Sequence, residues 1–246
     1  ILLFTEMPYL KLYLKNLISN QMKKLLIAVS ILLLSSAFTS FAQGYIFTDV
    51  VKVPATPVKN QASSGTCWSY ATAAFIESEL LRNGKGEHDI SEMFAVRINY
   101  LNKMNDNYLR RGNGNLGQGS LAHMFTNIVK RHGMIPQEAY NGINYQSELN
   151  NHRELNKYIT AFSAAAVELK QKSPQYDILA ESILDTYLGK VPEKFNYRGK
   201  EYTPLSFASE MGLNMDDYVE ITSLSHIPFY EKSVIEVPYN WYFGRF

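Results

Sequence analysis

The segment KNQASSGTCWSYATAAF, Lys59 to Phe75, carries Cys67, which is the one cysteine in a chain of 246 residues. Cys67 follows a Gly-Thr turn and opens a stretch in which apolar residues recur at helical spacing until Asn83-Gly84 stops it. The first turn of a helix presents backbone N–H groups without acceptors, and these favour a thiolate over a thiol. The pattern therefore predicts a helix over 67–82 with a reactive cysteine at its N-terminus.

Composition limits the class of protein. The chain is 46% hydrophobic and 13% aromatic, so it can bury a core. Its net charge of +1 comes without a basic stripe or a run of basic residues interleaved with aromatic ones. We therefore expect neither a disordered tail nor a nucleic-acid-binding protein, and we predict no cofactor and no metal site.

The N-terminal part has the layout of an export signal. The stretch MKKLLIAVSILLLSSAFTSFAQG begins at Met22 and combines two lysines, a short apolar run and small residues up to Ala42. We expect a signal peptide over 22–42, cleavage after Ala42 and export to the periplasm or the extracellular space, where a cysteine without a partner is reactive or intermolecular. Residues 1–21 are then an upstream extension and 43–246 the folded portion. A retained membrane anchor is the alternative, but no second apolar segment follows.

Periodicity predicts the further elements. Helices are expected after the cap residue Ser91, over 121–132, up to about Lys172 and over 178–188. The glycine-rich segment Arg110–Gly119 is predicted to be a loop in which the backbone passes close to another part of the protein. The C-terminal third, from Val191, favours short extended runs.

The surroundings of Cys67 are typical of a site for acyl transfer. Such a reaction needs hydrogen-bond donors aimed at a developing oxyanion, and the backbone N–H of Cys67 and the side-chain amide of Gln61 are candidates. The turn between them would let Gln61 fold back beside the sulfur, and Gly65 permits a close approach. The alternative is that Cys67 is a small buried hydrophobic residue.

The combination of Gln61, an intervening turn and Cys67-Trp68 resembles the active-site motif of papain-like cysteine peptidases. The resemblance assigns Cys67 as the nucleophile and Gln61 as an oxyanion-hole donor, both catalytic, and Trp68 to the substrate site. Where the family signature has Cys-Gly-Ser before the Cys-Trp pair, this chain has Ser64-Gly65-Thr66. The absent first cysteine fits a branch without disulfides.

Three further segments carry the resemblance. DISEMFAV (89–96) is similar to the start of the family's second helix, and GQGSLAHMFTNIVKRHGMIPQEAY (117–140) to the Gly-Gly segment whose backbone lines the substrate. Gln118 replaces one of the two glycines, and Gln118 with Gly119 is assigned to substrate binding. The segment TPLSFASEMGLNMDDYVEITSLSHIPFY (203–230) resembles the bleomycin hydrolase and bacterial aminopeptidase C branch.

This resemblance implies an α+β fold of the papain-like cysteine peptidase type. The chain would hold mainly the helical left domain with its insertion, and most of the β-rich right domain would lie beyond a truncated C-terminus. It also implies an aminopeptidase-like cysteine peptidase that hydrolyses peptides through a thioacyl enzyme, and a homo-oligomer. The catalytic His and Asn are expected downstream of Phe246. The alternative is a truncated, non-catalytic remnant that binds peptides without cleaving them.

The histidines within the chain are candidates for the catalytic base, and none of them is assigned to that role. His226, followed by Asn240-Trp241, mimics the order of the family's catalytic pair, but its segment is similar to one that precedes that pair, so it is not chosen. The other histidines are assigned as follows: His88 and His152 solvated, His123 off the apolar stripe of its helix, and His132 structural at a helix end.

A third possible function is that of an unrelated cysteine amidase that acts on cell-wall peptides. It would call for a nearby histidine followed by a β-barrel, and the helix-rich stretch 67–188 argues against it.

Overall fold

The structure is a computed structural model, which describes residues 8–37, 47–48 and 51–219. The chain divides into two units, Ile1–Lys52 and Val53–Phe246. The first unit contains the helix α1 (Pro8–Ala37), whose described side chains are exposed. None of the helices in the described ranges combines the length and the apolar character that crossing a membrane requires. Met22 lies inside α1, whereas the predicted cleavage position at Ala42 lies outside the described residues.

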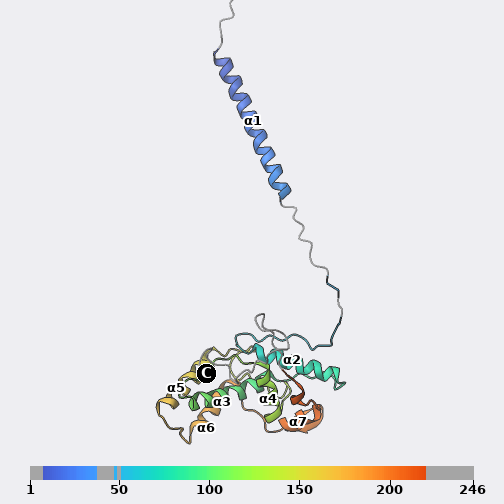
Figure 1. Cartoon of the computed structure of the whole chain (residues 1–246), viewed down its shortest axis with the longest axis vertical. Helices are drawn as coiled ribbons and strands as arrows, with labels where there is room; N and C mark the ends of the chain where they lie inside the picture. Colours follow the sequence, from blue (N-terminus) through green and yellow to red (C-terminus); the bar gives the residue numbers. More distant parts are fainter. Residues whose placement is uncertain (1–7, 38–46, 49–50, 220–246) are drawn as a thin grey trace, which may run out of the picture. The chain divides into compact units, whose positions relative to one another are not determined.

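The second unit is built mainly from helices, which Figure 1 shows packed into one body. In chain order its elements are α2 (Cys67–Arg82), α3 (Glu92–Leu109), α4 (Ala122–His132), α5 (Arg153–Glu168), α6 (Tyr176–Leu188), β1 (Phe195–Tyr197), β2 (Lys200–Tyr202), α7 (Pro204–Met211) and the 3-10 helix η1 (Met215–Asp217). The described residues hold one two-stranded sheet, and its order is β1-β2. This content agrees with the predicted helix-rich part of an α+β fold.

Helix α3 is the centre of the unit, because it contacts α2, α4, α5 and α6. Its start is fixed by Ser91, whose hydroxyl accepts a hydrogen bond from the Phe94 N–H at 3.2 Å, as expected of an N-cap. The side chains of Met93, Tyr100 and Met104 are all buried in the hydrophobic core. Figure 1 labels α3 within the body, between the labels of α5 and α4.

Helices α2 and α4 also match their predicted ranges. Helix α2 ends at the cap residue Asn83, and Gly84 follows with φ +71°, a conformation that glycine adopts without strain. Helix α4 ends at Gly133, which has φ +81° and donates its N–H to the Val129 carbonyl at 2.9 Å. A Cβ atom on Gly133 would lie 2.2 Å from the backbone of Pro204, so this glycine also permits α4 to pack against the start of α7.

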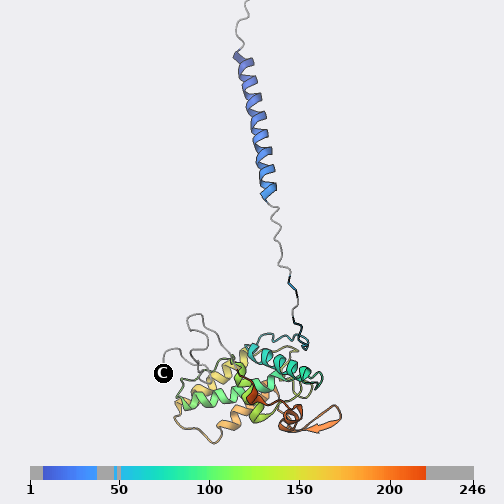
Figure 2. The same cartoon turned by 45° about the vertical axis from the view of Figure 1, so that its right-hand side comes forward.

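The β-hairpin and α7 form the edge of the unit (Figure 2). Strands β1 and β2 are antiparallel, with Phe195 opposite Tyr202, and the rings of both residues pack against Phe207 of α7. The hairpin agrees with the predicted extended runs. Helix α7 was not predicted, although Thr203 forms a capping box with Ser206 and Pro204 occupies the first helical position.

Candidate active site

Cys67 is the first residue of α2, and its side chain is exposed. The exposure contradicts the alternative of a small buried hydrophobic residue. The amides of Ser69 and Tyr70 both donate to the Thr66 carbonyl. Within the described residues the amides of Cys67 and Trp68 have no acceptor, and Thr66 makes no side-chain cap. The sulfur therefore lies beside unpaired N–H groups at the positive end of a helix, which is a favourable place for an anion.

The turn before Cys67 is closed by hydrogen bonds between its own residues. The Gln61 side chain donates through Nε2 to the Ser64 carbonyl at 2.8 Å, and the Ser64 hydroxyl donates to the Gln61 carbonyl at 2.8 Å. Ser64 Oγ is also hydrogen-bonded to Thr66 Oγ1 at 2.6 Å. A carboxamide nitrogen carries two hydrogens, so Gln61 keeps one N–H for a further acceptor. Gln61 thus folds back onto the turn that leads to Cys67, and its catalytic role stays a prediction.

The glycine-rich loop lies against this turn through Gln118. The Gly65 N–H donates to Gln118 Oε1 at 2.6 Å, and the Trp68 indole N–H donates to the Gln118 carbonyl at 3.1 Å. A Cβ atom on Gly65 would lie 3.1 Å from the Cβ of Gln118, so the close approach that Gly65 permits here is that of Gln118. Trp68 is 6% exposed and belongs to the core, so its side chain is connected to the loop by its hydrogen bond to the Gln118 carbonyl. Gly119, the other predicted substrate residue, is exposed beside Gln118.

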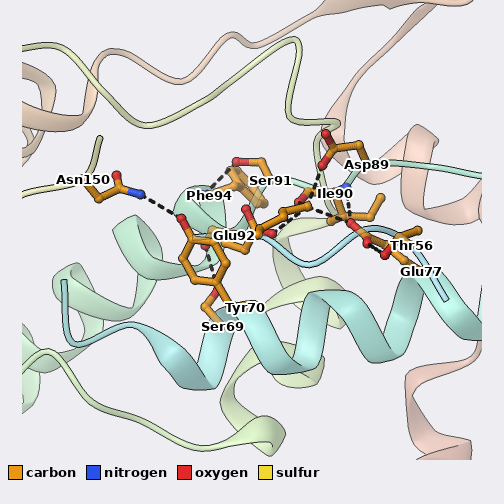
Figure 3. A network of polar contacts seen from close by, with 11 residues as sticks. Thr56, Ser69, Tyr70, Glu77, Asp89, Ile90, Ser91, Glu92, Phe94 and Asn150 are labelled. Carbon is orange, nitrogen blue, oxygen red and sulfur yellow. Dashed lines mark hydrogen bonds and ion pairs between the residues drawn. The ribbon is translucent and has the colours of Figure 1, made fainter. Parts of the chain in front are cut away.

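A segment that is distant in sequence braces the other side of the turn. The Ser63 N–H donates to the Asn150 carbonyl at 2.9 Å, and the His152 N–H donates to the Ser63 carbonyl at 3.2 Å. The Asn150 side chain donates to the Tyr70 hydroxyl at 2.7 Å, and Figure 3 shows this contact at the beginning of α2. The turn before Cys67 is thus held both by the glycine-rich loop and by residues 150–152.

The arm that leads into the turn is fixed by a buried ionic network around Lys59. Its Nζ lies 3.0 Å from Glu77, 2.6 Å from Glu92 and 2.6 Å from Asp89. Figure 3 shows the three carboxyl groups gathered where α2 passes the start of α3. The side chains of Glu77 and Glu92 are 0% and 2% exposed, whereas that of Asp89 is 62% exposed. Two of the three acids therefore depend on Lys59 for their charge compensation.

This network changes the ionisation of its members. Burial disfavours the Lys59 ammonium, but Glu92, Asp89 and Glu77 outweigh it and raise the pKa of Lys59 above its usual range. Burial raises the pKa of Glu92 although Lys59 is beside it. Burial together with the Glu92 carboxylate raises the pKa of Tyr70 to about 12. Lys59 therefore remains a cation, and the arm two residues before Gln61 is tied to both α2 and α3.

Two histidine predictions were wrong. His88 is 4% exposed and is hydrogen-bonded to the Tyr197 hydroxyl and the Lys85 carbonyl, both at 3.1 Å. His152 is 0% exposed and is hydrogen-bonded through Nδ1 to the Tyr100 hydroxyl at 3.0 Å. The charged neighbours Arg153 and Glu154 are exposed, whereas His152, the residue that precedes α5, is buried against Tyr100 of α3. Burial lowers the pKa of His152 to about 4.

The remaining histidine predictions have different outcomes. His132 is exposed in the last turn of α4, which fits a role at a helix end. His226 and Asn240-Trp241 lie outside the described residues. Among residues 51–219, no histidine is hydrogen-bonded to Cys67.

Sequence reasoning missed two charged residues that shape the site. The sequence motif includes Lys59 but does not reveal the acids with which it is buried. No sequence pattern indicates Lys103, which contacts the glycine-rich loop. The partners of both lie far along the chain. No local signal marks Lys103, because it stands between Asn102 and Met104 in a stretch of α3 that also carries Asn105 and Asp106.

Comparison with known proteins identifies the family. The model of the papain family of cysteine proteases matches residues 48–202. The chain therefore belongs to the papain family of cysteine proteases, as the residues around Cys67 predicted. It is also similar to the Cysteine proteinase 1, mitochondrial, of Saccharomyces cerevisiae strains YJM789 and ATCC 204508 / S288c, with 27% identity over 119 residues. That alignment covers 42% of this chain and 25% of the relatives, so the chain matches about a quarter of their length.

Proposed function

We propose that this chain carries the nucleophile of an aminopeptidase-like cysteine peptidase of the bleomycin hydrolase branch. The observation that carries the proposal is the exposed Cys67 sulfur at the N-terminus of α2, where the first amides have no acceptor among the described residues. Similarity to the yeast cysteine proteinase supports the branch. The substrate is a peptide, and the proposed reaction needs no cofactor.

In this reaction Cys67 attacks the peptide carbonyl carbon as a thiolate. A carbon–sulfur bond forms, and the carbonyl electron pair moves onto oxygen. The Cys67 N–H and the second Nε2 hydrogen of Gln61 donate to that oxyanion. Collapse of the intermediate expels the amine, which takes a proton from an imidazolium, and leaves a thioacyl enzyme. Water then gives a proton to the imidazole and attacks the thioester, which releases the acid and restores the thiolate.

The imidazole and the group that orients it are proposed to come from outside the described residues. His88 and His152 are hydrogen-bonded to other residues in the core. We further propose that the protein is exported after cleavage near Ala42, so that 43–246 is its folded portion, and that it forms a homo-oligomer. The export proposal follows from the sequence pattern of residues 22–42, and the oligomer from the family resemblance.

The test is the release of a fluorophore from an aminoacyl conjugate, measured with the 246-residue chain and with a chain extended along its own reading frame. C67S should abolish release in whichever chain is active. Q61A should lower kcat about 100-fold with little change in KM, because an oxyanion donor acts mainly in the transition state. S63A, which alters an exposed side chain of the same turn, is the matched control.

Two further comparisons sharpen this test. Equal release from substrates with a free and an acetylated N-terminus would contradict the aminopeptidase assignment. Loss of activity in H226A would show that His226 is the base and would contradict the expectation that its segment precedes the catalytic pair.

A further inference from the structure

Lys103 of α3 is a buried lysine without an acidic partner. The residue is 2% exposed, and within the described part of the chain its ammonium contacts backbone carbonyls and no carboxylate. Burial lowers the pKa of Lys103 to about 8, so the group still carries its charge in most molecules at pH 7. A buried charge that is not neutralised by an opposite charge lowers stability unless its hydrogen bonds compensate for lost water. The role of Lys103 can therefore be inferred from the two carbonyl groups that accept its hydrogen bonds.

Both acceptors belong to the glycine-rich loop. Lys103 Nζ donates to the Gly117 carbonyl at 2.6 Å and to the Gly119 carbonyl. One helical turn further along α3, Asn107 accepts the Gly114 N–H on its Oδ1 at 3.1 Å. A Cβ atom on Gly114 would lie 2.5 Å from the Cα of Asn107, so the loop backbone rests directly on the helix. One face of α3 thus holds the loop from behind.

The two carbonyls that Lys103 holds flank Gln118. On its other side Gln118 accepts hydrogen bonds from the Gly65 N–H and from the Trp68 indole N–H. Gly65 and Trp68 precede and follow the nucleophile in sequence. The contacts therefore form a continuous path from α3 through the loop to the turn that carries Cys67.

We propose that Lys103 is a positioning residue for substrate binding, because its ammonium fixes the backbone of 117–119 and thereby keeps Gln118 bonded to the Cys67 turn. The substrate-binding part of this inference rests on the proposed function. The positioning part is a property of the fold and is measurable without any substrate.

The variant that tests the proposal is K103M, which keeps a long side chain and removes all donors. The matched control is Y176F, which removes a buried hydrogen bond of 2.9 Å from the Tyr176 hydroxyl to the Met104 carbonyl. Y176F therefore weakens the same helix at the adjacent residue without touching the loop. K103Q, which can still donate to one carbonyl, is expected to give an intermediate result.

The first readout is amide hydrogen exchange at Gly65, resolved by NMR. Gly65 donates to Gln118 Oε1, so its exchange reports whether the loop is in place. In K103M we expect Gly65 to exchange at least about 10-fold faster than in the native protein, while amides in the middle of α2 keep their rates. Equal exchange at Gly65 in K103M and Y176F would overturn the proposal. Failure of both K103M and K103Q to fold, with Y176F folded, would also overturn it, since Lys103 would then support the whole fold.

The second readout is peptide hydrolysis by the active form of the chain. K103M should raise KM at least about 5-fold and leave kcat within about 2-fold, because a backbone contact made equally in the bound and transition states affects binding alone. Faster Gly65 exchange with an unchanged KM would overturn the substrate-binding part. If the native protein hydrolyses no peptide, the proposed function fails, and the exchange result still decides whether Lys103 positions the loop.

Discussion

Replacing Lys59 with methionine removes the ammonium that Glu77 and Glu92 share in the interior. Both acids are almost fully buried, and Glu92 Oε2 has no hydrogen-bond partner among the described residues. Breaking a buried ion pair by removing one partner typically costs about 3–5 kcal/mol, because a charge remains uncompensated. The ion pair with Asp89 contributes little to this cost, since the Asp89 side chain is largely exposed. We expect K59M to lose about 3–5 kcal/mol at pH 7, a large share of the stability of an ordinary domain.

The pH dependence and a double-mutant cycle test the cause of this loss. Burial already raises the pKa of Glu92, and loss of Lys59 should raise it further, so Glu92 takes up a proton as the pH falls. The cost of K59M should therefore be smaller at pH 5 than at pH 7. K59M with E92Q should be less destabilised than the sum of the single variants by about 1–3 kcal/mol.

Urea unfolding followed by circular dichroism measures these differences. K194M is the control, because Lys194 forms an ion pair of 2.8 Å with Glu201 in which both side chains are more than half exposed, and its loss should cost under about 1 kcal/mol. A K59M cost no larger than that of K194M, or one that is the same at both pH values, would refute the reasoning.

Two other predictions concern parts of the fold around the site. His152 has a pKa of about 4 in the folded chain and an ordinary value of 6.5, so the unfolded chain binds more protons between these values, and stability falls as the pH drops from 6.5 to 4. Relative to H152Q, the native protein should lose up to about 3 kcal/mol over that interval in urea unfolding at successive pH values, and parallel curves would exclude the assignment. G133A should cost about 2–4 kcal/mol in thermal or urea unfolding, since its Cβ would meet the backbone of Pro204. G86A, at φ +88° with open space around it, should cost only about 1 kcal/mol, and equal losses in the two variants would show that the contact is not the cause.

Local signals made the helices around the site predictable. The range 67–82 follows from apolar spacing that begins at Cys67 and from a stop at Asn83-Gly84, and both are properties of adjacent residues. Ser91 could be recognised as a cap for the same reason. Helix α7 was not predicted although Thr203 and the following proline signal a helix start, because the aromatic residues of that region favour extended structure.

Features that depend on tertiary contacts were not predictable. The charges around His152 suggested a solvated residue, but Tyr100 from α3 covers it. Lys59 and Lys103 became informative only when residues distant in sequence supplied their partners. The position of Cys67 at the start of α2 was anticipated, because it follows from a short segment, whereas the hydrogen bond of Gln61 to the Ser64 carbonyl was not.

The brace between Ser63 and residues 150–152 has a consequence for synthesis of the protein. The turn that bears the sulfur leaves the ribosome long before Asn150 and His152 do, and domains generally fold as units once their parts are available. Once α2 has left the ribosome, the nascent chain can form this helix, but it has none of these late contacts to fix the turn before Cys67. The turn before Cys67 therefore acquires its full set of contacts only when its pairing with residues 150–152 closes.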